Sequence, residues 1–149
     1  MSNSEGPATE PDTEVGHPGI VEPVLDMDLR LLVDLMDSDE AKEAAVGVTL
    51  NVPGGIVSGN IIGREAYLDS WDALTRGSGM SGLSGFQREA ERALDRAGVP
   101  KPTDFPRWIH LRDAAVMTPN QLVRFPIWRG RLADVSGWFL GVLRDDPKA

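Results

Sequence analysis

The alternation of apolar and polar residues predicts a helix and a β-hairpin in the first half of the chain. Residues 24–37 repeat apolar side chains at helical spacing. The stripe consists of Leu25, Leu29, Leu32 and Met36. Residues 46–52 alternate strictly, which predicts a half-buried strand. A turn at Pro53-Gly54-Gly55 separates it from a second strand over 56–63. Gly59 lies in the middle of that second strand and predicts a bulge or sharp bend.

The last third of the chain predicts three more strands. Residues 107–117 form one strand, and a turn at 118–120 ends it. Residues 123–132 and 135–143 are expected to form a hairpin across a tight turn at Ala133 and Asp134. Pro126 predicts that the fourth strand lies at an edge of the sheet or is kinked.

Residues 64–106 are expected to be an insertion between strands. Residues 64–75 are ambiguous between the end of a strand and a helix, and 77–85 read as a flexible Gly-Ser stretch. Residues 86–97 predict a helix with Ser84 and Gln87 as a capping box. One face of this helix is apolar, and the rest is charged and expected to be solvated. The apolar face consists of Phe86, Ala90, Ala93, Leu94 and Ala97.

Together these elements predict a mainly β protein with flanking helices (α+β). Five strands with several bend points predict a small, strongly bent, partly open antiparallel barrel with an N-terminal helix and an inserted helix. We expect a single domain over 23–143, with 144–149 as a polar tail. Residues 1–22 are rich in Pro, Gly, Ser, Thr and Glu, which predicts a disordered acidic tail.

The charge is distributed unevenly along the 149 residues. The net charge is −8, but residues 1–45 carry −10 and residues 46–149 carry +2. Such a split is typical of an acidic segment that contacts its own body or a basic partner, and it is equally consistent with an acidic tail that only maintains solubility. No apolar run approaches the ~20 residues of a membrane helix, and the acidic N-terminus is unlike a signal peptide. We therefore expect a cytoplasmic protein that does not bind membranes.

The sequence offers little catalytic chemistry. The absence of cysteine excludes disulfides, thiolate metal sites and cysteine nucleophiles. The segment 77–82 matches G-x-G-x-x-G but lacks the strand before it and the parallel βαβ unit that a dinucleotide site needs, so no cofactor is expected. His110 and Asp113 lie close in sequence, but they face opposite sides of a strand and no nucleophile accompanies them. We expect His110 to be a partly buried strand residue and the protein not to be an enzyme.

Arginine and tryptophan alternate in the third and fourth strands. Arg107 and Arg112 flank Trp108, and three arginines surround Trp128. These three are Arg124, Arg129 and Arg131. Such interleaving can bind phosphates and stack bases, although cation–π contacts and ordinary packing explain it equally well. The net charge of −8 argues against a nucleic acid partner.

Three segments carry a resemblance to a known family. The segments VTLNVPGGIVSGNIIGREAYL, WIHLRDAAV and WRGRLADVSGWFLGVL resemble the GvpU family of gas vesicle accessory proteins. The resemblance covers roughly residues 24–75 and 107–143 and leaves the N-terminal tail and the glycine-rich insertion unmatched. The spacing of the glycines is also similar to that of Sm-like and SH3-like barrels. The RNA-binding Asp-x-apolar-apolar-Asn step of Sm proteins is missing, because residues 65–69 (EAYLD) stand there instead.

The resemblance implies a non-enzymatic protein that assists the assembly or clustering of gas vesicles. Its expected partners are gas vesicle proteins and other copies of itself, with pairing through an edge strand as one route. Contacts of the acidic tail are another route. The residues expected to carry the interaction are Trp128, Arg129, Arg131 and Trp138. The alternative is an Sm-like RNA-binding module.

Overall fold

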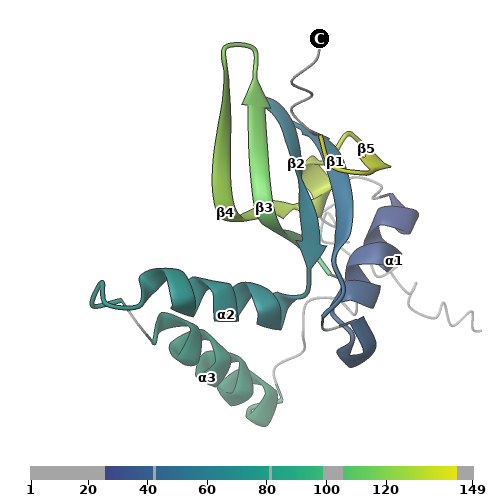
Figure 1. Cartoon of the computed structure of the whole chain (residues 1–149). Coiled ribbons are helices and arrows are strands. Elements are labelled where there is room, and N and C mark those ends of the chain that lie inside the picture. The colour runs from purple at the N-terminus through teal and green to yellow at the C-terminus, as the bar shows by residue number, and fades with distance from the viewer. Residues whose placement is uncertain (1–25, 42, 81, 99–105, 144–149) are drawn as a thin grey trace, which may run out of the picture.

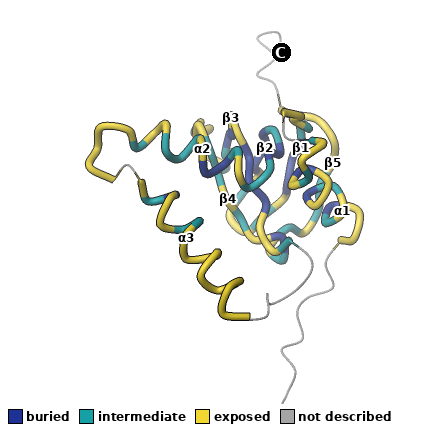
Figure 2. The backbone as a smooth tube through the Cα atoms, turned by 90° about the horizontal axis from the view of Figure 1, so that it is seen from below, coloured by how far each residue is buried: buried dark blue, intermediate teal, exposed yellow. Residues whose placement is uncertain are grey.

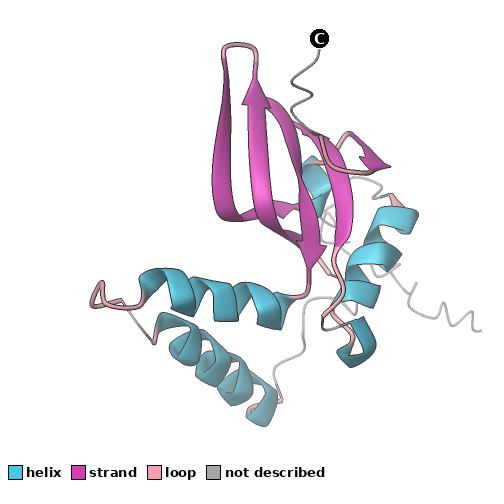
Figure 3. Ribbon diagram, viewed as in Figure 1, coloured by secondary structure: helices cyan, strands magenta, loops and turns pink. Residues whose placement is uncertain are grey.

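The computed structural model describes residues 26–41, 43–80, 82–98 and 106–143. Over these ranges it has one five-stranded antiparallel sheet with three α-helices, which confirms the expected mainly β, mixed class (Figures 1 and 3). The elements are α1 (Met27–Met36), the 3-10 helix η1 (Asp39–Ala41), β1 (Val46–Val52), β2 (Gly55–Ile62), α2 (Arg64–Thr75), α3 (Leu83–Arg96), β3 (Trp108–Thr118), β4 (Gln121–Arg131), the 3-10 helix η2 (Leu132–Asp134) and β5 (Gly137–Leu140). The predicted tails 1–22 and 144–149 lie outside the described residues.

The strand order of the sheet is β4-β3-β2-β1-β5. The hairpin predicted across Ala133 and Asp134 is therefore wrong, because β4 pairs with β3 and β5 pairs with β1 at the opposite edge. The residues of that turn belong to η2, which leads the chain from one edge to the other. The sheet is not closed into a barrel, since β4 and β5 are not neighbours in it.

The sheet is bent at a bulge opposite Gly59, as the sequence predicted. Ser58 pairs with Ala115 and Asn60 with Arg112, so β3 has one extra residue there, and Asp113 adopts a left-handed φ of 53°. A Cβ on Gly59 would lie 3.1 Å from the carbonyl oxygen of Arg112, which is closer than most side chains allow. Beyond the bend, the second half of β4 passes behind the neighbouring strands toward β5 (Figure 1). The prediction of an edge strand at Pro126 is confirmed.

The hydrophobic core lies between α1 and the concave face of the sheet. Helix α1 contributes Leu29, Val33 and Met36, all buried. The strands contribute Val48, Leu50, Val57, Ile61, Ile109, Leu111 and Ala114. The helix begins at Met27 rather than at residue 24, and Asp26 caps it by accepting hydrogen bonds from two backbone N–H groups. Residues 24 and 25 of the predicted helix lie outside the described ranges.

The opposite face of β1 and β2 is also covered at Thr49 and Ser58, so the prediction of a half-buried β1 is wrong at Thr49 and confirmed at Asn51, which is exposed. Thr49 and Ser58 are both only 2% exposed, and their hydroxyl oxygens lie 3.0 Å apart. Thr49 donates to the carbonyl of Gly141 at 2.8 Å, and the Leu143 N–H donates to the Ser58 hydroxyl at 2.7 Å. The segment after β5 therefore folds over this face and satisfies two buried hydroxyls.

The insertion contains two helices rather than one. Residues 64–75, ambiguous in sequence, form α2, whose first N–H group is capped by Asp37 from the end of α1 at 2.6 Å. Helix α3 begins at Leu83, within the expected flexible stretch. Ser84 is inside the helix and not its cap, because Gly82 occupies that position without a side-chain hydrogen bond. The predicted capping box is therefore wrong.

Candidate interaction surface

A shallow pocket lies where the end of β4 meets the turn after β1. Its volume is about 330 Å³. The lining residues are Val52, Pro53, Trp108, Trp128, Arg129, Gly130, Arg131 and Asp134. The bend of β4 is what brings these segments together, since Val52 and Trp128 are 76 positions apart in sequence and not on paired strands. We refer to these eight residues as the tryptophan pocket.

The walls of the tryptophan pocket are fixed by close packing. The ring of Trp128 lies over Gly130, so close that a Cβ there would be 2.1 Å from the ring. Glycine is therefore the residue that lets this ring fold back along its own strand. Trp128 is half-buried and packs against the hydrophobic core. Packing on both sides therefore holds this aromatic wall of the pocket in place.

Two arginines form the charged rim of the pocket. The guanidinium carbon of Arg129 lies 4.1 Å from the centre of the Trp108 ring, which is a cation–π contact. Arg131 pairs with Asp134 at 3.2 Å. Trp108 is 40% exposed, so part of this residue stays accessible to a partner beside the Arg129 guanidinium. Aromatic and arginine side chains in this arrangement are typical of protein recognition surfaces.

The structure brings three of the four predicted interaction residues together, and the fourth lies elsewhere. Trp128, Arg129 and Arg131 line the tryptophan pocket. Trp138 packs against the core from β5, and its indole N–H donates to the Asp26 carboxylate at 3.0 Å. This bond is the main cause that lowers the pKa of Asp26 below its ordinary value. Trp138 therefore anchors the start of α1.

Trp108 is the aromatic pocket residue that the predicted set did not include. In the sequence, the arginines nearest to Trp108 are Arg107 and Arg112, which lie on the same strand. In the sheet its register partner on the adjacent strand β4 is Arg131, and the guanidinium that stacks on its ring comes from Arg129, two residues before Arg131. Only the register of β3 against β4 determines this pairing, and no pattern within one strand indicates it.

His110 lies in the contact between the sheet and α2. It is 5% exposed, and its ring centre is 4.5 Å from that of Tyr67. Burial, together with the positive charges of Arg129 and Arg64, lowers the pKa of His110 to about 4. The imidazole is therefore neutral at pH 7 and covered by α2. The prediction of a partly buried strand histidine is confirmed, and the burial is nearly complete.

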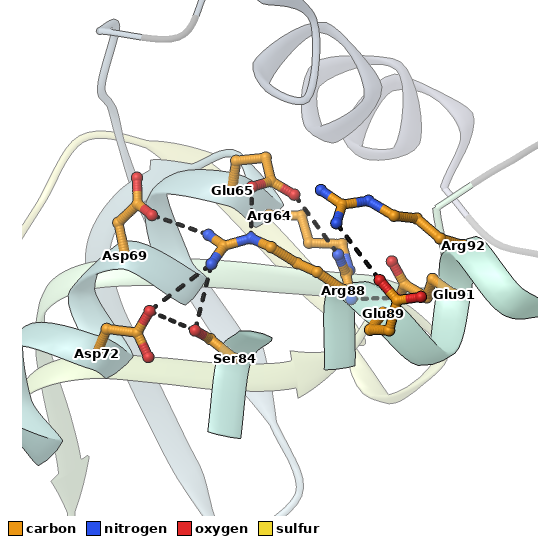
Figure 4. A network of polar contacts seen from close by, with 9 residues as sticks. All are labelled: Arg64, Glu65, Asp69, Asp72, Ser84, Arg88, Glu89, Glu91 and Arg92. Carbon is orange, nitrogen blue, oxygen red and sulfur yellow. Dashed lines mark hydrogen bonds and ion pairs between the residues drawn. The ribbon is translucent and has the colours of Figure 1, made fainter. Parts of the chain in front are cut away.

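A polar network joins α2 to α3 (Figure 4). Arg88 of α3 pairs with Glu65 at 3.0 Å, with Asp69 at 2.8 Å and with Asp72 at 3.6 Å, all on α2. Ser84 donates to Asp72, and Arg64 pairs with Glu91. Arg88 and Glu91 of α3 thus contact α2, so the expectation that the charged side is solvated is wrong for Arg88, which is half-buried, and is confirmed for the other charged residues of the helix, which are exposed.

The described residues show neither a metal cluster nor a spanning helix. Within the four described ranges, no three His, Asp or Glu side chains are grouped so that they could hold a metal ion. None of the helices described is long and apolar enough to cross a membrane.

Comparison with known proteins gave one result. A model of the family described as "Gas vesicle protein GvpU-like" matches residues 26–143. The matched range includes residues 76–106 with α3, which the resemblance in the sequence left unmatched. Neither a search of curated proteins nor a search of solved structures gave a match.

Proposed function

The chain belongs to the GvpU-like family of gas vesicle proteins, and from this premise we propose that it is a non-enzymatic accessory protein of gas vesicles in the cytoplasm. It assists their assembly or clustering by binding vesicle proteins and by associating with other copies of itself. A protein with one surface that binds vesicles and another that binds a second copy of the protein can link two vesicles. Many such contacts together give a high overall affinity even when each single contact is weak.

The tryptophan pocket is the observation that carries this proposal. It combines the aromatic rings of Trp108 and Trp128 with two arginines on its rim. A peptide segment or loop with an apolar anchor and a carboxylate suits such a surface, because the anchor contacts the tryptophan rings while the carboxylate meets Arg129. The one described histidine, His110, is buried beneath Tyr67 and cannot serve the pocket as a base.

Co-flotation with purified gas vesicles tests the proposal. The protein is mixed with vesicles and centrifuged, and the fraction that rises with them is measured. Trp128→Ala and Arg129→Ala should each weaken binding by about tenfold, as expected for central interface residues. Arg112→Ala is the matched control, since this arginine is 48% exposed and does not line the pocket.

Two results would contradict the proposal. One is flotation that the pocket variants leave unchanged. The other is binding to a mixed RNA pool with a steep salt dependence that Arg129→Ala and Arg131→Ala abolish, because that pattern identifies an Sm-like RNA-binding module instead.

A further inference from the structure

Helix α3 has an apolar face that points away from its packing partner. The side of α3 that contacts α2 carries Ser84 and Arg88. The opposite side carries Phe86, which is 71% exposed, and Leu94, which is 52% exposed. Three exposed alanines, at positions 90, 93 and 97, lie between and beside them. We call these five residues the α3 apolar face.

This face is displayed far from the core. Helix α3 lies on the far side of α2 from the sheet, and nearly its whole length is exposed (Figures 1 and 2). Phe86 has the highest exposed fraction of the large apolar side chains described. An amphipathic helix with its apolar side turned outward is costly for a monomer and is typical of an association surface.

We propose that the α3 apolar face pairs with the same face of α3 in a second copy of the chain, with the two helices antiparallel. This inference rests on the proposed function, because it names the surface through which the copies associate. The two-fold symmetry of such a pair means that every contact occurs twice.

Charge complementarity supports a second copy as the partner. Glu89 and Arg96 lie on one flank of the apolar face, seven residues apart, which is close to two helical turns. In an antiparallel pair centred near residue 92, Glu89 of each copy lies opposite Arg96 of the other. The six charged residues of α3 are three acids and three arginines, so the helices have no net charge to repel each other, although the whole chain carries −8.

Shape complementarity supports the same register. Antiparallel pairing about this centre sets the large Phe86 of one helix against the small Ala97 of the other. Ala90 and Ala93 meet at the middle, where small side chains allow the two backbones to approach closely. Large side chains are thus opposed by small ones along the whole contact, which is how helix surfaces interdigitate.

A charge exchange tests the pairing in the full-length protein. Sedimentation velocity over a dilution series measures the self-association of each variant. Glu89→Arg and Arg96→Glu, made separately, should each weaken self-association about tenfold or more, because each sets like charges opposite one another. The double variant, with both substitutions, should restore it.

Mixing the wild-type chain with the double variant separates pairing between copies from helix stability. In each chain the contact between residues 89 and 96 within its own helix is between opposite charges, as it is in the wild type. Between the two chains, like charges would oppose each other. Each protein should therefore associate with itself and not with the other, which differently tagged chains in a pull-down will show. Free mixing of the two would overturn the proposal.

Disulfide trapping locates the contact directly, because the chain has no native cysteine. Ala93→Cys should form linked dimers on mild oxidation. Ala73→Cys, at an exposed alanine of α2, is the matched control and should not. A monomeric protein at all concentrations, or crosslinking of Ala93→Cys to a vesicle protein instead of a second copy, would contradict the proposal. Co-flotation of the charge variants, measured in parallel, reports vesicle binding separately, so this inference can fail while the proposed function stands.

Discussion

The body of the molecule and the α2–α3 hairpin are held together by different forces. In the body, α1 and the sheet bury a continuous apolar cluster that includes Leu50 and Ile61, both fully inaccessible to solvent. In the hairpin, α2 attaches to the sheet through a small cluster around Tyr67 and Leu68, whereas α3 is attached to α2 mainly by the ion pairs of Arg88.

This difference shows what each region can do. Burial of apolar surface contributes more to folding stability than any other favourable interaction. The core of the body therefore supplies most of the stability of the fold. Exposed ion pairs contribute little, which makes α3 the element that can move or exchange partners at low cost. The region with the weaker attachment also displays Phe86, which has the highest exposed fraction of the large apolar side chains described.

The largest effect is expected from a cavity in the body. Leu50→Ala should lower the free energy of unfolding by about 2–5 kcal/mol, because Leu50 is fully buried and its neighbours cannot fill the space. Leu74→Ala, at a 52% exposed leucine of α2, should change it by about 0.5 kcal/mol or less. Urea unfolding measures both. Equal losses in the two variants would mean that the contrast between the regions is wrong.

The junction between the two regions should respond to acid. His110 keeps a pKa of about 4 in the fold, whereas the unfolded chain has the ordinary value of 6.5. As the pH falls below 6.5, the unfolded chain binds a proton that the folded chain does not, so stability is lost until the pH reaches about 4. The loss is on the order of 3 kcal/mol over this window.

Urea unfolding at several pH values isolates this contribution. His110→Gln should remove the part of the pH dependence between 6.5 and 4 that belongs to the histidine, while the titration of the carboxylates stays. If the wild type and His110→Gln show parallel pH profiles, the buried imidazole does not titrate as described.

The smallest effect on global stability is expected at the α2–α3 contact. Arg88→Met removes the central ion pairs of the network in Figure 4 but should lower the free energy of unfolding by only about 1 kcal/mol or less. Amide hydrogen exchange should nevertheless accelerate in α3 and remain unchanged in β1–β3. Arg92→Met is the control, since Arg92 pairs with Glu89 of the same helix. Equal protection of α3 in wild type and Arg88→Met would show that the network does not hold the helix.

Local patterns in the sequence were sufficient to identify most elements. The alternation in 46–52 predicted β1 with its observed bounds, and Gly59 marked the bulge. These features depend on one segment at a time: side chains alternate along a strand, and a mid-strand glycine permits close backbone approach. The aromatic and arginine residues of β4 were also identifiable, because their chemistry is typical of interaction surfaces wherever they lie.

The pairing of elements was decided only by the tertiary structure. The sequence could not separate Trp128 from Trp138, since both are tryptophans on predicted strands, and only the strand order places one in the pocket and the other against Asp26. Asp37 caps α2 by accepting a hydrogen bond from the Arg64 N–H, 27 positions away, so no pattern within one segment predicts this contact. The apolar stripe of α3 was visible in the sequence, yet which side of the helix faces its neighbour depends on the carboxylates of α2 that meet Arg88. Contacts between distant segments depend on the free energy of the whole fold, and a pattern within one segment does not contain that information.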